Sequence, residues 1–361
     1  MPHVSIMIKP ASSLCNLGCK YCFYHSLADS RESYDYGIMS SATAEKLISD
    51  AFSLAEGDSV AFAFQGGEPL IAGAEYFERF TEFVLKANAE NIPVYYSLQT
   101  NGTLINEEWA RFFKKHGFLI GLSLDGDRNF NRNRMYKNGA YAYNDIIKAA
   151  DILTEYGVDF NVLTVLTADI AENIETVYRF FTDRGFRYLQ FIPCLRPFGD
   201  KSESRLYMTA EQYGDYLVRI FNLYVKDYVS GNYTSVRQLD NYVRLFRGEP
   251  PEQCGMNGHC SHQLVIEGNG NVYPCDFYCL DEYLLGNVNE TSLTALSRSA
   301  AAVGFIEESL PADERCKSCA FYKMCRGGGC KRSKADRDYC TSYKKFFSSC
   351  LPLFRVFLDR K

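Results

Sequence analysis

The chain has 361 residues, of which 47% are apolar and 15% aromatic, as is typical of an ordered globular protein of about two domains. Its formal net charge of −5 leaves no basic excess to neutralise phosphates, which argues against a nucleic-acid partner. The N-terminus shows no signal-peptide pattern, and no apolar run is long enough to span a bilayer. We therefore expect a cytoplasmic protein without a membrane partner, in which the 14 cysteines are metal ligands rather than disulfides.

Short apolar segments alternate with helical patterns in the first half of the chain. The expected strands are Val4–Ile8, Val60–Phe64, Val94–Leu98, Leu119–Leu124, Phe160–Leu166 and Leu189–Ile192. The expected helices are Ser41–Leu54, Ala74–Ala89, Asn106–His116, Asn144–Tyr156 and Ala171–Arg184. This alternation predicts an α/β fold with a parallel sheet and right-handed crossovers. The pattern by itself fits both a partial barrel and an open sheet.

Two further segments follow the alternating region. Residues 206–250 are rich in tyrosine and phenylalanine at helical spacing, which predicts a packed helical bridge rather than a substrate site. From residue 251 the density of cysteine rises, so we predict domains at 1–205 and 251–361 on either side of the bridge. In the second domain, turn residues around Gly268-Asn-Gly270 predict a β-hairpin over Gln263–Tyr273.

Three cysteines follow the first expected strand with the spacing C-x3-C-x2-C: Cys15, Cys19 and Cys22. Three thiolates can hold three irons of a [4Fe–4S] cluster and leave the fourth iron open to bind a substrate. Four cysteine ligands would instead produce an electron carrier. The alternatives are a zinc site or unrelated buried thiols.

Polar or glycine-bearing segments follow the next three expected strands. Gln65-Gly-Gly-Glu-Pro69 follows the second strand, Thr100-Asn-Gly102 the third and Asp125-Gly126 the fourth. The carboxyl ends of parallel strands gather at one edge of a sheet, so these segments predict a single site. Glycines there let a ligand approach the backbone closely, although an ordinary turn would explain the GGEP segment alone.

The C-terminal third is the other cysteine-rich region. Cys316-x2-Cys319-x5-Cys325 is followed by Gly-Gly-Gly-Cys330, a four-cysteine set for which a structural zinc ribbon is the alternative. We expect Cys194, Cys279 and Cys350 to be small buried apolar residues.

The cysteine motifs resemble those of radical S-adenosylmethionine (SAM) enzymes with a SPASM-type extension, and the whole chain resembles the anaerobic sulfatase-maturating enzymes. This resemblance favours a partial (β/α)6 barrel of the TIM type followed by an iron–sulfur domain. The segments that carry it are Ile8-Lys-Pro-Ala-Ser12, Cys22-Phe-Tyr-His-Ser26, Phe62-Ala-Phe-Gln-Gly-Gly-Glu-Pro69, Gln99-Thr-Asn-Gly-Thr103, Cys254-Gly-Met-Asn-Gly258 and Tyr273-Pro-Cys-Asp-Phe-Tyr278.

The resemblance implies SAM and three [4Fe–4S] clusters as cofactors. It assigns Cys15, Cys19 and Cys22 to the first cluster, Cys254, Cys260, Cys275 and Cys330 to a first auxiliary cluster, and Cys316, Cys319, Cys325 and Cys340 to a second. It also implies contacts to SAM or substrate from Tyr24, Gln65, Gly66, Gly67, Glu68, Asn101, Ser123, Asp125 and Leu195.

The implied reaction oxidises a cysteine or serine of an unfolded sulfatase segment, Cys/Ser-x-Pro/Ala-x-Arg, to Cα-formylglycine without oxygen. A 5′-deoxyadenosyl radical removes hydrogen from the substrate Cβ, Asp276 takes the thiol or hydroxyl proton, and an iron–sulfur cluster takes the remaining electron. The resemblance further implies a monomer with an electron donor such as flavodoxin or ferredoxin. The alternatives are a radical SAM maturase that crosslinks another peptide, and a non-catalytic electron-transfer or zinc-ribbon protein.

Overall fold

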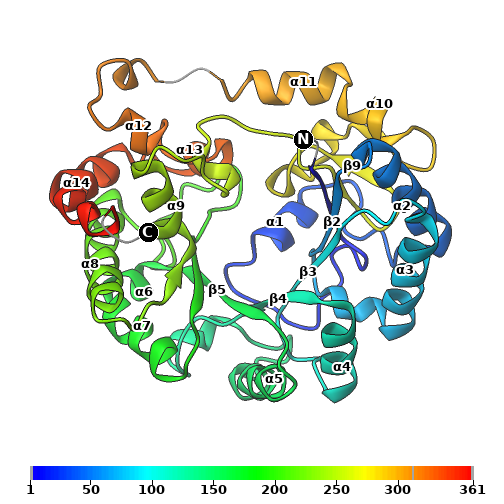
Figure 1. Cartoon of the computed structure of the whole chain (residues 1–361), viewed down its shortest axis with the longest axis horizontal. Coiled ribbons are helices and arrows are strands. Elements are labelled where there is room, and N and C mark those ends of the chain that lie inside the picture. Colours follow the sequence, from blue (N-terminus) through cyan, green and yellow to red (C-terminus); the bar gives the residue numbers. More distant parts are fainter. Residues whose placement is uncertain (1–2, 311–312, 359–361) are drawn as a thin grey trace. The chain divides into compact units, whose positions relative to one another are not determined.

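The computed structural model describes residues 3–310 and 313–358, and the chain divides into two compact units. The first unit holds residues 1–123, 134–160 and 262–305, and the second holds 124–133, 161–261 and 306–361. Both are α/β structures in which parallel strands alternate with helices (Figure 1). The domain limits predicted from the sequence at 205 and 250 remain a prediction. No helix among the described residues is long and apolar enough to cross a membrane.

The first unit is built on a sheet in the order β10-β9-β8-β1-β2-β3-β4. Strands β1 to β4 are parallel, β8 pairs with β1 in parallel, and β9 and β10 continue the sheet antiparallel. The strands are β1 His3–Ile8, β2 Ser59–Phe64, β3 Val94–Thr100, β4 Phe118–Ser123, β8 Val265–Ile266, β9 Asn271–Tyr273 and β10 Gly286–Asn287.

A row of apolar side chains crosses this sheet and sets its register. Ile8 lies opposite Phe64, Phe64 opposite Leu98, and Leu98 opposite Ile120, and all four side chains are buried. Partners in adjacent strands point to the same face, so this row forms a continuous part of the core. The carboxyl ends of the parallel strands are thereby brought level, and the segments that follow them come together.

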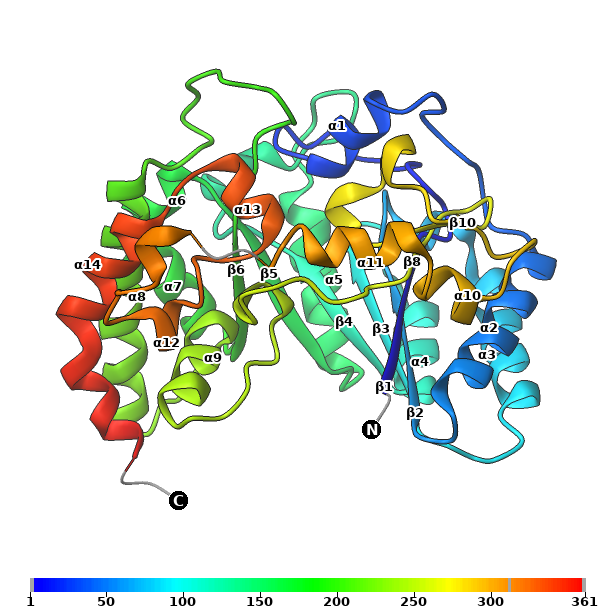
Figure 2. The same ribbon diagram turned by 90° about the horizontal axis from the view of Figure 1, so that it is seen from above.

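Helices α2, α3 and α4 cover one face of the first unit's sheet, and the short α1 lies towards the carboxyl ends of its strands (Figures 1 and 2). Ser40 caps α2 by accepting a hydrogen bond from the Thr43 backbone N–H, as its place before the helical pattern predicts. The helices of this unit are α1 Phe23–Asp29, α2 Ser41–Ala55, α3 Ala74–Ala87, α4 Glu107–His116, α5 Tyr143–Glu155 and α10 Leu293–Ser297, and α11 Ala300–Glu307 begins in it.

The second unit places helices around the parallel strands β5 Phe160–Leu166, β6 Tyr188–Pro193 and β7 Ser235–Val236. Its core is aromatic: Phe221 of α8 stacks on Phe354 with ring centroids 4.4 Å apart, and it meets the edge of Phe346 of α14. The helices are α6 Ala168–Glu172, α7 Ile174–Asp183, α8 Ala210–Val229, α9 Arg237–Phe246, α12 Tyr322–Cys325, α13 Lys331–Asp336 and α14 Cys340–Cys350. The aromatic stretch that follows residue 205 therefore forms core, as its helical spacing predicts.

One difference from the expected elements has a physical cause. The single helix predicted over Ala171–Arg184 is wrong, because α6 ends before Asn173 and α7 begins after it. The Asn173 side chain donates to the Asp169 carbonyl oxygen at 2.8 Å, which competes with helix continuation. The hairpin predicted over Gln263–Tyr273 is confirmed as β8 and β9, but its parallel pairing with β1 has no local signal in the sequence.

Candidate functional site

The three-cysteine loop begins directly after β1 and ends at α1. The Cys22 side chain caps α1 by accepting from the His25 backbone N–H at 3.4 Å, and Cys15 accepts from the Leu17 N–H at 3.4 Å. Asn101 adds a side-chain N–H 3.8 Å from the Cys15 sulfur. Such donors stabilise thiolate sulfur, and all three cysteines are partly exposed. The loop therefore offers three accessible thiols, two of which, Cys15 and Cys22, already accept from N–H groups.

The protonation of these thiols depends on whether a cluster is bound. Burial raises the pKa of Cys15 to about 11, and the Glu68 carboxylate and Cys22 add to that shift. Iron binds the thiolate, so loading the loop must release protons. Arg134 is buried near Cys22, where its positive charge favours the thiolate of that residue.

The glycines of the GGEP segment support the cysteine loop itself. A Cβ atom on Gly67 would lie 2.1 Å from the Leu14 carbonyl oxygen, and one on Gly66 would lie 2.8 Å from the Ser12 carbonyl oxygen. The Gly67 N–H donates to that Ser12 oxygen at 2.8 Å, and the Glu68 N–H donates to the Leu14 oxygen at 2.7 Å. Only glycine permits this close approach, which fixes the backbone just before Cys15.

Glu68 is fully buried, and its carboxylate is used within the protein. It accepts from the Thr100 hydroxyl at 2.8 Å, the Asn101 N–H at 2.8 Å and the Leu70 N–H at 3.1 Å. Burial outweighs these three bonds and raises the pKa of Glu68 to about 7. The side chain thus ties the end of β2 to the end of β3, and places Asn101 beside Cys15.

The remaining residues assigned to SAM lie at strand ends of both units. Gln65 follows β2, and Ser123 is the buried last residue of β4. In the second unit, Asp125 is fully buried and accepts from the Val165 N–H at 2.9 Å, while Leu195 follows β6 and is partly exposed.

Asp276 lies in a buried group of charges in the first unit. Its carboxylate forms an ion pair of 2.5 Å with the ammonium of Lys9, whose side chain is 1% exposed. The same ammonium lies 3.6 Å from the centre of the Tyr24 ring. Burial alone would lower the pKa of Lys9, but the charges of Asp276 and Glu267 outweigh it and the pKa is raised. Asp276 therefore has a cation fixed beside it.

Glu267 is the second carboxylate of this buried group. It accepts hydrogen bonds from Ser12 at 3.0 Å, from Arg31 at 2.8 Å and from the Tyr24 hydroxyl. Two carboxylates and two cations are thus buried together around the Tyr24 ring, which satisfies the charge of each. Tyr24 is consequently enclosed, and its hydroxyl is directed at Glu267.

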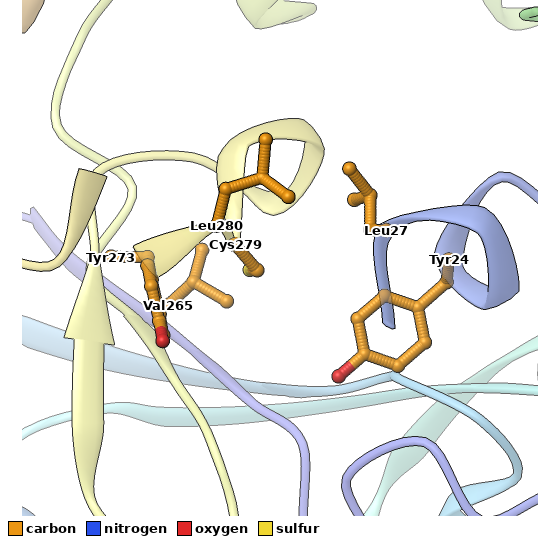
Figure 3. Close-up of a cluster of buried hydrophobic side chains, with 6 residues drawn as sticks. All are labelled: Tyr24, Leu27, Val265, Tyr273, Cys279 and Leu280. Carbon is orange, nitrogen blue, oxygen red and sulfur yellow. The ribbon is translucent and has the colours of Figure 1, made fainter. Parts of the chain in front are cut away.

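Apolar side chains pack around Tyr24 and fix the position of the Asp276 segment. Tyr24 and Leu27 of α1 are in one buried cluster with Val265, Tyr273, Cys279 and Leu280 of the hairpin and its continuation (Figure 3). Phe23 packs against Phe277, with ring centroids 5.0 Å apart. The cluster joins the helix after the cysteine loop to the segment of Cys275 and Asp276, residues more than 240 positions apart.

The four cysteines assigned to the second auxiliary cluster line one cavity of about 450 Å³ in the second unit: Cys316, Cys319, Cys325 and Cys340. Burial raises the pKa of Cys325 to about 12, and the other three thiols add to the shift, which reflects their proximity. No set of three or more Cys, His, Asp or Glu in the described ranges is close enough to hold a single metal ion. A cavity of this size that is lined by four cysteines can hold a cube of four irons.

Three of the four cysteines assigned to a first auxiliary cluster, Cys254, Cys260 and Cys330, belong to the second unit. Burial raises the pKa of Cys254, with nearby charge on Cys260 and Cys330 adding to it. A Cβ atom on Gly255 would lie 3.3 Å from the Cys330 Cβ, so these three thiols of the second unit are neighbours. Cys275 follows β9 in the first unit.

Cys194, Cys279 and Cys350 are the buried cysteines, whereas the eleven assigned to clusters are all partly exposed. This confirms the expectation that the three are packed apolar residues.

Sequence reasoning missed Lys9, Glu267 and Arg31. Lys9 directly follows the apolar strand that ends at Ile8, and this position could have predicted that its side chain is buried. Glu267 and Arg31 gave no such signal, because each is buried only through pairing with distant residues.

Comparison with known proteins agrees with this geometry. Residues 10–181 match the Radical SAM superfamily and residues 254–320 the SPASM iron-sulfur cluster-binding domain. Cysteine-type anaerobic sulfatase-maturating enzymes of Clostridium novyi (strain NT) and Clostridium perfringens (strain 13 / Type A) are 43% and 42% identical, over 96% and 98% of this chain and 95% and 97% of theirs. The serine-type enzyme of Klebsiella aerogenes is 30% identical over 98% of this chain and 86% of its own.

Solved structures give the same result. Polyhistidine-tagged anSMEcpe with bound AdoMet superposes with a TM-score of 0.95 at 39% identity, covering 100% of this chain and 96% of that one. Native anSMEcpe with bound AdoMet and Cp18Cys peptide gives 0.94 at 38% identity and full coverage of both chains. The predicted fold class, a radical SAM domain with a SPASM domain, is confirmed, and with it SAM and [4Fe–4S] clusters as cofactors. The chain therefore belongs to the anaerobic sulfatase-maturating enzymes of the radical SAM superfamily.

Proposed function

We propose that this enzyme is of the cysteine type and oxidises a cysteine in an unfolded sulfatase segment, Cys-x-Pro/Ala-x-Arg, to Cα-formylglycine. The observation that carries this is its 41–43% identity to cysteine-type enzymes, against 29–30% for the serine type. The acid–base chemistry points the same way. A thiol has a pKa near 8.5 and yields its proton to a carboxylate far more readily than a hydroxyl does.

Asp276 is the proposed base for the thiol proton. Its carboxylate is buried, has Lys9 fixed at 2.5 Å, and follows Cys275 directly in sequence. The nearby cation fixes the orientation of the carboxylate, which a proton acceptor requires. When bound, SAM and its cluster supply the one-electron chemistry that removes a hydrogen atom from the substrate Cβ.

The residues that we propose for SAM lie at strand ends within each unit. Gln65, Gly66 and Gly67 present backbone after β2, Ser123 ends β4, Asp125 comes two residues later, and Leu195 follows β6. Glu68 acts through Asn101, since its carboxylate already accepts three hydrogen bonds. Tyr24 acts through Lys9 and Glu267, because its ring lies against the Lys9 ammonium and its hydroxyl donates to Glu267.

The proposed assembly is a cytoplasmic monomer that receives electrons from a flavodoxin or ferredoxin. Eleven partly exposed cysteines, all present as free thiols, support the location, because thiols stay reduced and available to iron in a reducing compartment. The match to an iron–sulfur cluster-binding family supports a one-electron partner.

The test is an anaerobic reaction of the reconstituted enzyme with SAM, dithionite and three peptides. These carry Cys-x-Pro-x-Arg, Ser-x-Pro-x-Arg, or alanine in place of the reacting residue. We expect mass spectrometry to show aldehyde on the cysteine peptide in equal amount to 5′-deoxyadenosine, a lower kcat/KM for serine, and no aldehyde for alanine. Cleavage of SAM with no change in either reactive peptide would overturn the substrate assignment and favour another peptide maturase.

A further inference from the structure

We propose that the surface formed by Lys334, Arg337 and Lys344 is the docking site of an acidic one-electron carrier protein of the flavodoxin or ferredoxin class. We call it the basic surface. The inference rests on the proposed function, because it requires the second auxiliary cluster to be held by the four cysteines of the same cavity.

The distribution of charge along the chain is strongly uneven. Residues 313–345 contain ten Lys and Arg and four Asp and Glu, a net charge of +6, although the whole chain has −5. The rest of the protein therefore carries −11. A positive segment on an otherwise acidic protein attracts an acidic partner to one place and repels it from others.

The uncompensated positive charge lies at the cavity of the second auxiliary cluster. Lys334, Arg337 and Lys344 all line that cavity. In the described part of the chain their side chains make no ion pair or hydrogen bond, and the buried Arg337 Nε has no partner. Arg315, on the same cavity, is instead neutralised by Asp313 at 2.6 Å and Asp338 at 2.8 Å.

The position of the cysteines suits transfer to a docked protein. Cys316 and Cys319 are partly exposed and alternate with the exposed Lys317, Ser318 and Ala320. A cluster held there would lie near the surface, where a carrier could approach closely. Complexes of electron carriers are small and transient, and opposite charge provides their orientation and fast association.

Electron balance gives the carrier a defined task. Removal of a hydrogen atom and then a proton from the substrate leaves one electron to be passed on. If the second auxiliary cluster accepts that electron, a carrier that was oxidised when it reduced the first cluster can take the electron back at the basic surface. The carrier thereby gains the one electron that the substrate loses, so the electrons of the reaction balance.

The experiment measures binding of a bacterial flavodoxin to the reconstituted enzyme by calorimetry, at 50 and 300 mM NaCl. The variant is Lys334→Glu with Lys344→Glu. The matched control reverses two exposed lysines of the first unit that make no ion pair, Lys115→Glu with Lys148→Glu, which changes net charge equally. We expect at least tenfold weaker binding for the first variant, with a smaller salt dependence, and less than twofold change for the control.

Crosslinking gives a second measurement that does not depend on a variant. A carbodiimide joins lysine to carboxylate at contact distance, so mass spectrometry of the native complex should identify Lys334 or Lys344. Equal loss of affinity in both variants, or crosslinks confined to the first unit, would overturn the proposal. So would unchanged affinity with a shifted reduction potential of the cluster, since the cations would then only balance cluster charge. Dithionite-driven aldehyde formation by the unaltered enzyme tests the proposed function separately.

Discussion

The group of four buried charges around Tyr24 is the feature that most constrains the chemistry at the scale of single residues. Lys9 and Arg31 balance Asp276 and Glu267 with no exposed member. Removing one member leaves its partner charged and buried, which costs far more than the pair itself contributes. The group therefore both orients Asp276 and limits which substitutions the fold accepts.

Asp276→Asn should separate SAM cleavage from product formation. Asparagine keeps the shape of the side chain but cannot take the thiol proton, so we expect aldehyde formation to fall about 100-fold or more. 5′-Deoxyadenosine should still form, and the measurement is the ratio of the two products. Glu282→Gln, an exposed carboxylate on the same segment, is the control and should retain the native ratio. Full aldehyde formation by Asp276→Asn would exclude that residue as the base.

Lys9→Met should destabilise the protein by about 3–5 kcal/mol, because it leaves the Asp276 carboxylate buried without its cation. Adding Asp276→Asn removes that charge as well, so the double variant should recover part of the loss. Urea unfolding of the two single variants and the double variant measures this coupling. Strictly additive effects would show that the ion pair does not act as a unit.

Glu68 should make stability depend on pH. Its folded pKa of about 7 lies above the usual 4.5, so between these values the folded chain retains a proton that the unfolded chain loses. The free energy of unfolding should therefore decrease as pH rises from about 4.5 to about 7, by up to about 3 kcal/mol, and the contribution is absent above that window. Urea unfolding at pH 5 and pH 8 should show a smaller decrease in the free energy of unfolding for Glu68→Gln than for the unaltered protein. Parallel profiles for the two proteins would contradict the assignment.

At the scale of elements, the central feature is the contact between the strand end that carries Gly67 and the loop that carries Cys15. Two short backbone hydrogen bonds join them, and the Leu14 carbonyl oxygen occupies the space that a side chain on residue 67 would need. The parallel sheet brings these ends level, and the glycine then lets them touch.

Gly67→Ala should displace the cysteine loop, since the added Cβ would lie 2.1 Å from the Leu14 carbonyl oxygen. We expect the variant to lose about four of its irons and all SAM cleavage. Iron analysis and 5′-deoxyadenosine assays measure both. Gly304→Ala, where nothing lies within 4 Å of the new Cβ, is the matched control and should load normally. Native iron content in Gly67→Ala would show that the loop tolerates displacement.

At the scale of the whole molecule, the cysteines divide into partly exposed ligands and buried packing residues. This division predicts about 12 irons per chain in three clusters. Cys319→Ala should lower that value to about eight and leave SAM cleavage in place, because the three-cysteine loop is unaffected. Cys350→Ala, which alters a buried cysteine, should keep the full iron content. Equal iron loss in both variants would mean that the division by exposure does not report ligands.

Local patterns predicted most of the elements. The alternation of apolar runs and helical patterns placed β1 to β6 within two residues at each end, and the aromatic spacing predicted the core of α8 correctly. The helix expected over Ala171–Arg184 was wrong because Asn173 uses its side chain on the backbone, which periodicity does not detect.

The sequence by itself indicated the chemistry: the spacing of Cys15, Cys19 and Cys22 and the later cysteines favour iron–sulfur binding, and the resemblance that these motifs and the GGEP segment carry implies SAM, since motifs are local properties. Only the tertiary structure decided how the site is held together. Lys9 meets Asp276, and Tyr24 meets Glu267, across more than 240 positions. Gly67 serves the cysteine loop, and three unpaired cations gather at one cavity. Such contacts arise from strand pairing and burial, whose energies depend on residues far apart in the chain.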